Sequence, residues 1–252
     1  MTLSPDLIRS AFAALFLALP GFLFSQAEPA AGKQVELSLS APNGIDVPYL
    51  LALPKGYGEE AGKKWPVILF LHGRGESNGP LSVVASWGPP RFAARGDDFP
   101  YIVISPQCPR ETNWRDPEQQ AGVLAVLDDT LKKYDADASR VYLTGLSMGG
   151  YGSWSLAAKQ PKRFAAVAPI CGGGSPEDAA ILATLPIWAF HGDQDTAVPF
   201  ERSVEMVEAI KKAGGEKILF TTMEEFGHNS WCAAYATPQL YHWFNKHSQE
   251  SE

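Results

Sequence analysis

The sequence predicts an α/β fold with a mostly parallel central sheet of about eight strands and helices on both faces. Short apolar runs rich in β-branched residues alternate along the chain with longer stretches in which apolar residues recur at helical spacing. Such alternation is typical of βαβ units, whose helices cover both sides of a parallel sheet. The chain has 252 residues, of which 45% are hydrophobic and 19% charged, and this composition indicates a globular domain.

The first strands are of two kinds. Residues 35–40 and 47–53 alternate around an Asn43-Gly44 turn, which predicts an antiparallel pair. Residues 66–71 form a continuous apolar run, as expected for a strand that is buried on both faces of a parallel sheet.

The later elements alternate between strand and helix. Residues 118–134 carry apolar side chains at helical spacing, with acidic residues early and lysines late, as the helix dipole favours. Residues 78–100 are too long for a simple connection, and they either shape a binding site or form an ordinary surface excursion. Further strands are predicted at 101–105, 141–144, 164–170, 186–190 and 218–223, and further helices at 201–213, at 238–247 and from residue 150 onward.

The five residues after the strand at 141–144 carry the strongest functional signal. Gly145, Leu146, Ser147, Met148 and Gly149 spell G-x-S-x-G between a strand and a helix. This context is typical of the nucleophile elbow of an α/β-hydrolase fold, a sharp turn that lifts a serine hydroxyl above the sheet edge. The turn strains the serine backbone and packs helix against strand, so the flanking positions have no room for a Cβ atom. Ser147 is the predicted nucleophile.

The predicted serine needs a base, and the base needs an acid that fixes its tautomer. In this fold the acid and the histidine follow the serine in chain order, each in a loop after a later strand. We predict Asp195 as the acid because it lies further into its loop than Asp193, the alternative, which is expected to cap the turn. We predict His228 as the base because it lies between the last strand and the last helix. His72 and His191, at strand ends, are expected to hydrogen-bond loops.

Acyl transfer also requires hydrogen-bond donors for the oxyanion. The rule for this fold gives the N–H of the residue after the nucleophile, here Met148, and an N–H from the loop after the third strand. That loop contains Gly73 and Arg74, and we predict the backbone N–H of Arg74 as the second donor, with Gly73 as the alternative. The Arg74 side chain is then free to be a solvated surface charge. This chemistry requires no metal and no organic cofactor.

Together these motifs resemble those of a known family, the secreted or periplasmic esterases described as predicted peptidases. These are relatives of the prolyl-oligopeptidase-type and phospholipase/carboxylesterase-type serine hydrolases in the α/β-hydrolase superfamily. The resemblance covers residue 35 to the C-terminus and implies a triad of Ser147, Asp195 and His228. It rests on LHGRGE at 71–76, SPQCP at 105–109, TGLSMGGYG at 144–152, PICGGG at 169–174 and the Ser230-Trp231 pair.

Four aromatic residues lie in segments that this fold places near the catalytic rim. Each is predicted either to bind substrate or to pack in the core or rim. Two or more of them in one cleft would favour an acyl or aromatic acid group, as in feruloyl or acetyl esters of plant polysaccharide. The four residues are Trp87, Trp114, Tyr151 and Trp231.

The N-terminus predicts export. Arg9 precedes an apolar run at 10–24. Small residues follow at 25–27, the positions that a signal peptidase recognises before the cleavage site. The run is shorter than the ~20 apolar residues that a bilayer span requires. We therefore expect a signal peptide at 1–27, a catalytic domain at 28–252, a secreted or periplasmic protein and no stable membrane anchor after cleavage.

The charge and the cysteines exclude other classes. A net charge of −7 argues against nucleic acid, which is bound through clustered Lys and Arg. Cys108, Cys171 and Cys232 permit at most one intramolecular disulfide and lack the CxxC spacing of zinc or redox sites. We expect them to be buried, structural thiols.

These patterns predict an exported serine carboxylesterase that acts on a small-molecule or polysaccharide-linked ester. One alternative is a serine peptidase of the prolyl-oligopeptidase type that acts on short peptides. Another is a non-catalytic hydrolase fold that serves as a binding module. The second alternative predicts that a triad residue is missing, whereas the sequence supplies all three.

Overall fold

The computed structural model describes residues 28–249. The predicted signal peptide at 1–27 lies outside the described residues.

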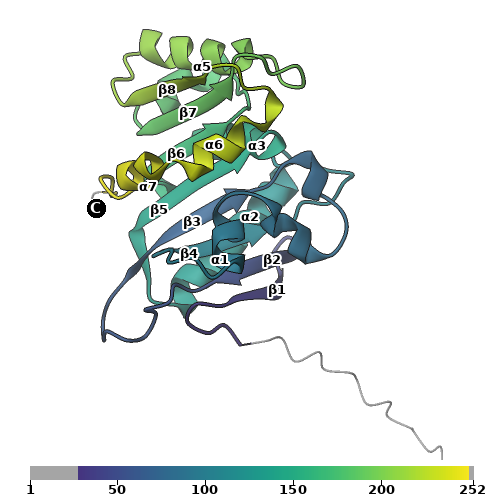
Figure 1. The fold of residues 1–252 in the computed structure, drawn as a ribbon, viewed down its shortest axis with the longest axis vertical. Coiled ribbons are helices and arrows are strands. Elements are labelled where there is room, and N and C mark those ends of the chain that lie inside the picture. The colour runs from purple at the N-terminus through teal and green to yellow at the C-terminus, as the bar shows by residue number, and fades with distance from the viewer. Residues whose placement is uncertain (1–27, 250–252) are drawn as a thin grey trace, which may run out of the picture.

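An eight-stranded sheet forms the centre of the molecule, in the order β1-β2-β4-β3-β5-β6-β7-β8 (Figure 1). β2 runs antiparallel to both of its neighbours, and the other neighbouring pairs are parallel, which confirms the predicted sheet. The strands are β1 Gln34–Ser40, β2 Asp46–Ala52, β3 Trp65–Leu71, β4 Ile102–Pro106, β5 Ala136–Leu146, β6 Ala166–Ile170, β7 Ile187–Gly192 and β8 Ile218–Met223.

Helices cover both faces of this sheet, as predicted. The central strand β3 shows why, because Val67, Leu69 and Leu71 face one apolar layer while Ile68 and Phe70 face the other. The first layer is completed by α2 (Pro117–Lys133), α3 (Met148–Lys159), α4 (Ala179–Leu182) and α5 (Glu201–Lys212). The second is completed by α1 (Gly88–Ala94), α6 (Trp231–Ala236) and α7 (Pro238–Phe244), of which α6 and α7 cross in front of the strands in Figure 1.

Short 3-10 helices connect these elements, and some boundaries differ from the sequence-based ones. β5 begins at Ala136 instead of 141, because its start pairs with Trp65 beyond an irregularity in the β3–β5 ladder. The last helix ends at Phe244 instead of 247. The segment 78–100 contains a 3-10 turn and α1, whose prolines favour a helix start. The 3-10 helices are η1 Arg74–Glu76, η2 Leu81–Ser86, η3 Pro161–Arg163, η4 Pro176–Asp178 and η5 His228–Ser230.

The turn from β5 into α3 holds Ser147 at the carboxyl edge of the sheet. Ser147 has φ 52° and ψ −115°, a backbone conformation that costs a non-glycine residue of order 1–3 kcal/mol. Its N–H donates to the Ile170 carbonyl at 3.0 Å, which ties the turn to the end of β6. A Cβ atom at Gly149 would overlap the Leu71 carbonyl oxygen, and one at Gly145 would overlap the Gly149 carbonyl. The helix therefore approaches β3 at a distance that only glycine permits.

Because β3, β5, β7 and β8 are parallel, the loops after their carboxyl ends open at one edge of the sheet. These loops carry, in chain order, the predicted residues Arg74, Ser147, Asp195 and His228.

The close packing of the turn makes a stability prediction. We expect Gly149→Ala to lower the free energy of unfolding by about 3 kcal/mol or more, because the new methyl group must displace the β3 backbone. Gly75→Ala is the matched control, since a Cβ there meets no atom within 4 Å. Urea unfolding followed by circular dichroism measures both variants. Equal stabilities would contradict the packing described here.

Candidate active site

Three predicted side chains form one hydrogen-bonded chain at the sheet edge. His228 Nε2 lies 2.9 Å from Ser147 Oγ, and His228 Nδ1 lies 2.7 Å from Asp195 Oδ2. Ser147 comes from the β5–α3 turn, Asp195 from the loop after β7, and His228 from η5 after β8. The imidazole is thus oriented by a carboxylate on one side and faces a hydroxyl on the other.

The Asp195 carboxylate is buried, and both of its oxygens accept hydrogen bonds. Its Oδ1 accepts the N–H groups of Ala197 and Val198, each at 2.9 Å. Burial on its own would raise the pKa of this carboxyl, but the hydrogen bond from His228 and the two backbone N–H groups outweigh burial and lower the pKa. Asp195 is therefore a stable anion beneath the imidazole. The competing Asp193 instead accepts the N–H of Glu225 at 2.8 Å and braces the neighbouring loop.

The two residues predicted to supply the oxyanion donors, Met148 and Arg74, line the same pocket as Ser147. Met148 is the first residue of α3 and Arg74 the first residue of η1, so neither N–H has an acceptor within its own helix. The 12-residue α3 also directs the positive end of its dipole toward Ser147. A developing oxyanion would find favourable electrostatics here.

Buried side chains hold the loop that carries Arg74. His72 Nδ1 donates to the Gly73 carbonyl at 2.6 Å, and its Nε2 accepts the Cys108 N–H at 2.9 Å. The bond that Nε2 accepts requires the neutral ring, and burial lowers the pKa of His72 to about 4. The Trp114 indole N–H donates to the His72 carbonyl at 2.9 Å. His72 thus hydrogen-bonds loops, as expected from the sequence.

The Arg74 side chain is more than a solvated charge. Its Nη1 donates to the carbonyls of Arg110 and Thr112 at 2.8 and 2.7 Å, which joins the β3 loop to the loop after β4.

An open pocket of about 270 Å³ lies beside the serine. Its lining includes Ser147, Met148 and Tyr151 together with Arg74, Asn113 and Arg115. The Arg115 guanidinium carbon lies 5.4 Å from the centre of the Tyr151 ring. This side of the serine is polar and bears two arginines.

Aromatic side chains border the histidine on another side. The Trp231 ring stands perpendicular to the His228 ring, with 5.1 Å between the ring centres. The ring centres of Trp87 and Trp231 lie 6.0 Å apart. Trp87, Tyr151 and Trp231 are all partly exposed near the predicted site. Of the two predicted alternatives, Trp114 takes the packing role and not the substrate contact, because it is only 2% exposed and its indole N–H holds the His72 loop.

His191 also contacts the predicted acid, which its sequence context did not predict. Its ring is buried, and its Nε2 lies 3.1 Å from Asp195 Oδ2, the same oxygen that His228 contacts. The spacing His191-x-x-x-Asp195 after a strand is the one signal for this contact, but spacing does not say on which side of the aspartate the ring lies.

One group of side chains offers ligand atoms for a metal. Atoms of Cys171, Asp195 and His228 lie within 4.8 Å of one another. However, Asp195 and His228 are already hydrogen-bonded to each other, and burial raises the pKa of Cys171 strongly, so its thiol stays protonated. The group fits a hydrogen-bonded site better than a cation site.

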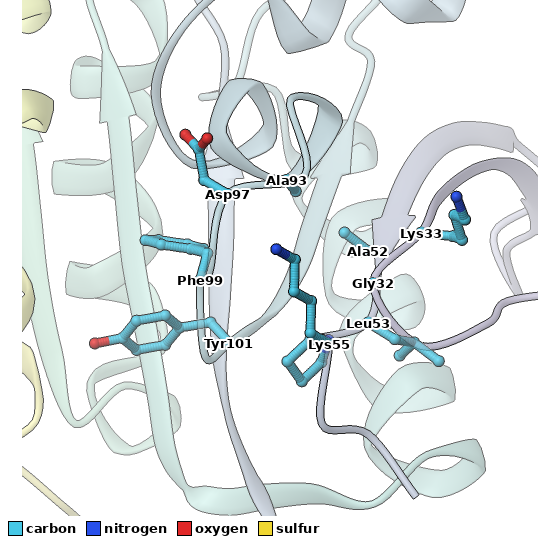
Figure 2. A pocket seen from close by; sticks show the side chains of 10 residues that line it. Gly32, Lys33, Ala52, Leu53, Lys55, Ala93, Asp97, Phe99 and Tyr101 are labelled. Atoms are coloured by element: carbon cyan, nitrogen blue, oxygen red, sulfur yellow. The ribbon is translucent and has the colours of Figure 1, made fainter.

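A second hollow lies away from these residues. It is bordered by Lys55, Phe99 and Tyr101, among others, and Figure 2 shows these side chains around it. Its volume of about 10 Å³ is near the minimum for one water molecule, so no organic ligand fits.

Comparisons with known proteins agree with the fold. A sequence profile of the Dienelactone hydrolase family matches residues 106–229, which include Ser147, Asp195 and His228. A solved structure of a thermostable esterase superposes with a TM-score of 0.73 at 31% identity, over 86% of this chain and 63% of that chain. The chain belongs to the α/β-hydrolase superfamily.

Two fungal proteins are similar to this α/β-hydrolase in sequence. Feruloyl esterase B of Neurospora crassa is 34% identical over 118 residues, which are 42% of this chain and 38% of that protein. The probable feruloyl esterase C of Aspergillus niger is 28% identical over 236 residues, or 88% of this chain and 83% of that protein. The chain thus spans well under half of the first protein and most of the second. These comparisons support a hydrolase of the esterase type.

Within residues 28–249 of this α/β-hydrolase, no helix combines the length and the apolar character needed to cross a membrane.

The buried His72 predicts a dependence of stability on pH. Its pKa is about 4 in the folded protein against 6.5 ordinarily, so the unfolded chain binds the proton first as the pH falls. Its stabilising contribution is complete above pH 6.5 and is lost as the pH falls toward 4, by at most about 1.4 kcal/mol per pH unit. His72→Gln keeps an acceptor near Nε2 but does not titrate. We expect a shallower loss of unfolding free energy between pH 6.5 and 4.5 in this variant, measured by urea titration.

Burial also lowers the pKa values of His191 and His247. These two histidines therefore contribute equally to the pH dependence of the unfolding free energy in the wild type and in His72→Gln. Identical slopes for the variant and the wild type would contradict a neutral His72.

The three thiols differ in accessibility. Cys108 and Cys171 are buried, whereas Cys232 is exposed on α6, which corrects the expectation that all three are buried. Ala234 and Tyr235 of the same short helix face the core, so Cys232 falls on its outer side. We expect one thiol per chain to react with Ellman's reagent in the native protein and three after denaturation. Two or more fast native thiols, or a Cys232→Ser variant that still reacts, would contradict this arrangement.

Proposed function

We propose that this chain is an exported serine carboxylesterase that cleaves carboxylic esters through an acyl-enzyme on Ser147. The observation that carries the proposal is the continuous hydrogen-bonded chain from Ser147 Oγ through His228 to Asp195. The serine–histidine contact has the length that proton transfer to a base requires, and the histidine–aspartate contact has the length of a hydrogen bond that orients the base.

In the proposed reaction, Ser147 Oγ attacks the ester carbonyl carbon while His228 Nε2 takes the hydroxyl proton. The tetrahedral intermediate then collapses, and Nε2 gives this proton to the departing alcohol. A water molecule attacks the acyl-enzyme, again losing a proton to Nε2, and the acid leaves as the proton returns to Oγ. Throughout, Asp195 accepts a hydrogen bond from the Nδ1–H of His228 and stabilises the imidazolium form.

The N–H groups of Met148 and Arg74 are the proposed oxyanion donors. Both belong to residues that start a helix, and both follow immediately after residues whose conformations are fixed by buried contacts. Such preorganised donors need no reorganisation when charge develops on the carbonyl oxygen, and one of them is typically worth ~10²- to 10³-fold in rate.

The surroundings of the serine support an ester with an aromatic acid group. Trp87 and Trp231 form an aromatic wall next to His228, and the polar pocket with Tyr151 accepts the other side of the ester. Relatives of this chain carry the name feruloyl esterase. We therefore propose a feruloyl or acetyl ester, either small or linked to a polysaccharide. Trp114, being buried, is not included in this binding surface.

Export through the signal peptide at 1–27 forms part of the proposal. The motif of a charged residue, an apolar run and small residues supports it. Sequencing the N-terminus of protein recovered from the producing cells tests cleavage near residue 27.

The proposed triad predicts graded losses of activity. We expect Ser147→Ala to lower kcat for p-nitrophenyl acetate by about 10⁶-fold, because the nucleophile is lost. Asp195→Asn is expected to lower it by about 10⁴-fold, because the amide no longer fixes the His228 tautomer. Asp193→Asn is the matched control and should retain activity, since that carboxylate contacts a loop N–H instead of the histidine. Retained turnover in Ser147→Ala, or equal losses in both aspartate variants, would overturn the assignment.

A substrate panel separates the proposal from its alternatives. Methyl ferulate, acetylated xylan, p-nitrophenyl esters of increasing chain length and proline-containing peptides are compared at equal concentration. We expect turnover of esters and none of peptides. Peptide cleavage in preference to esters would favour the peptidase, and failure of a fluorophosphonate to label Ser147 would favour the binding module.

A further inference from the structure

The Asp195 carboxylate contacts two imidazole rings. Oδ2 lies 2.7 Å from Nδ1 of His228 and 3.1 Å from Nε2 of His191. His191 comes from the end of β7 and its side chain is fully buried, as is that of Asp195. On the far side of the ring, His191 Nδ1 lies 2.7 Å from the hydroxyl of Ser203 in α5. Asp195 is therefore flanked by two histidine–serine pairs.

The proton positions on His191 follow from its partners. Nε2 faces two acceptors, Asp195 Oδ2 and the Val198 carbonyl oxygen at 3.0 Å, so Nε2 carries a proton. Nδ1 and the Gly172 carbonyl both lie within hydrogen-bond distance of the Ser203 hydroxyl, at 2.7 and 2.8 Å. Whichever of the two receives the hydroxyl proton, the N–H of His191 still points at the carboxylate.

We propose that His191 is a positioning residue for the reaction, and that Ser203 and His191 form a second arm that fixes the Asp195 carboxylate for His228. This inference rests on the proposed function, because it assigns a role toward the acid of the proposed triad.

Burial gives this second arm its effect. His191 and Ser203 are 0% and 1% exposed, so water does not replace either partner. The N–H groups of Ala197 and Val198 hold Oδ1, and the N–H of His191 restrains rotation of the carboxylate that would take Oδ2 away from His228. A carboxylate held at both oxygens keeps the imidazole aimed at Ser147, which is the geometric condition for fast proton transfer.

The same contact sets the basicity of the site. A second N–H on Oδ2 withdraws electron density from the oxygen that stabilises the imidazolium form of His228. The titratable groups that face His191 are Asp195 and, beyond it, His228, and the Cys171 thiol lies near the same carboxylate. From α5, Ser203 and the Phe200 ring complete its surroundings without adding charge. Removal of the His191 N–H should therefore make the His228 imidazole a stronger base.

Two amide substitutions separate the arm from simple packing. The amide nitrogen of Gln lies close to Nε2 of a histidine in the same rotamer, whereas that of Asn lies close to Nδ1. His191→Gln can thus still donate toward Asp195, and His191→Asn cannot. The variants are compared in kcat and KM for p-nitrophenyl acetate from pH 5 to 9, with active sites counted by the burst of a fluorophosphonate titration.

We expect His191→Asn to lower kcat by about ten- to a hundredfold, the effect of losing one hydrogen bond to a charged group, with KM unchanged. The acidic limb of its kcat/KM profile should move to higher pH, because the stronger base must lose its proton before it can act. His191→Gln should recover most of the rate and restore the limb. Ser203→Ala, which leaves the Nε2 proton in place, should lower kcat less than His191→Asn and leave the limb unmoved.

The outcomes distinguish this inference from the proposed function. Equal losses in the Gln and Asn variants, or a loss that is uniform across pH, would overturn the positioning role and leave the triad intact. Full activity of Ser147→Ala would overturn the triad itself. Should His191→Asn fail to fold, a shifted acidic limb in His191→Phe supports the inference and an unshifted limb overturns it.

Discussion

The close contact between α3 and the end of β3 is the constraint on which the rest of the structure depends. Gly149 lies so near the Leu71 carbonyl that no side chain fits between them. This contact forces the chain to turn sharply at Ser147, and the strained backbone there lifts the hydroxyl toward His228. The same contact places the N–H of Met148 next to the hydroxyl. One packing requirement thus places the proposed nucleophile, the proposed oxyanion donor and the N-terminus of α3 together.

The second organising feature is a buried charge. Asp195 is stable as an anion because two backbone N–H groups and two imidazoles satisfy it, and these donors come from the loop after β7, from β7 itself and from η5. A buried carboxylate with fewer donors would take up a proton. The strands that deliver these elements are parallel neighbours, so the sheet topology and the electrostatics support each other.

The sequence predicted the fold well because its signals are local. The buried strand β3 is one apolar run, and the G-x-S-x-G turn requires its glycines for reasons that lie within a few residues. Features that depend on contacts distant in sequence were less predictable. The burial of Trp114 depends on its contact with the His72 loop, which is distant in sequence. The exposure of Cys232 depends on how α6 is oriented against the core. His191 belongs to a predicted motif, yet its contact with Ser203 depends on how α5 packs.

We propose that Ser147 Oγ attacks the ester while the Met148 N–H stabilises the oxyanion that forms. A crystal structure of the protein after reaction with diethyl p-nitrophenyl phosphate tests both parts at once. We expect phosphorus bonded to Ser147 Oγ and its phosphoryl oxygen within hydrogen-bond distance of the Met148 N–H, with His228 still held by Asp195. Phosphorus on another residue, or a phosphoryl oxygen turned away from that N–H, would contradict it.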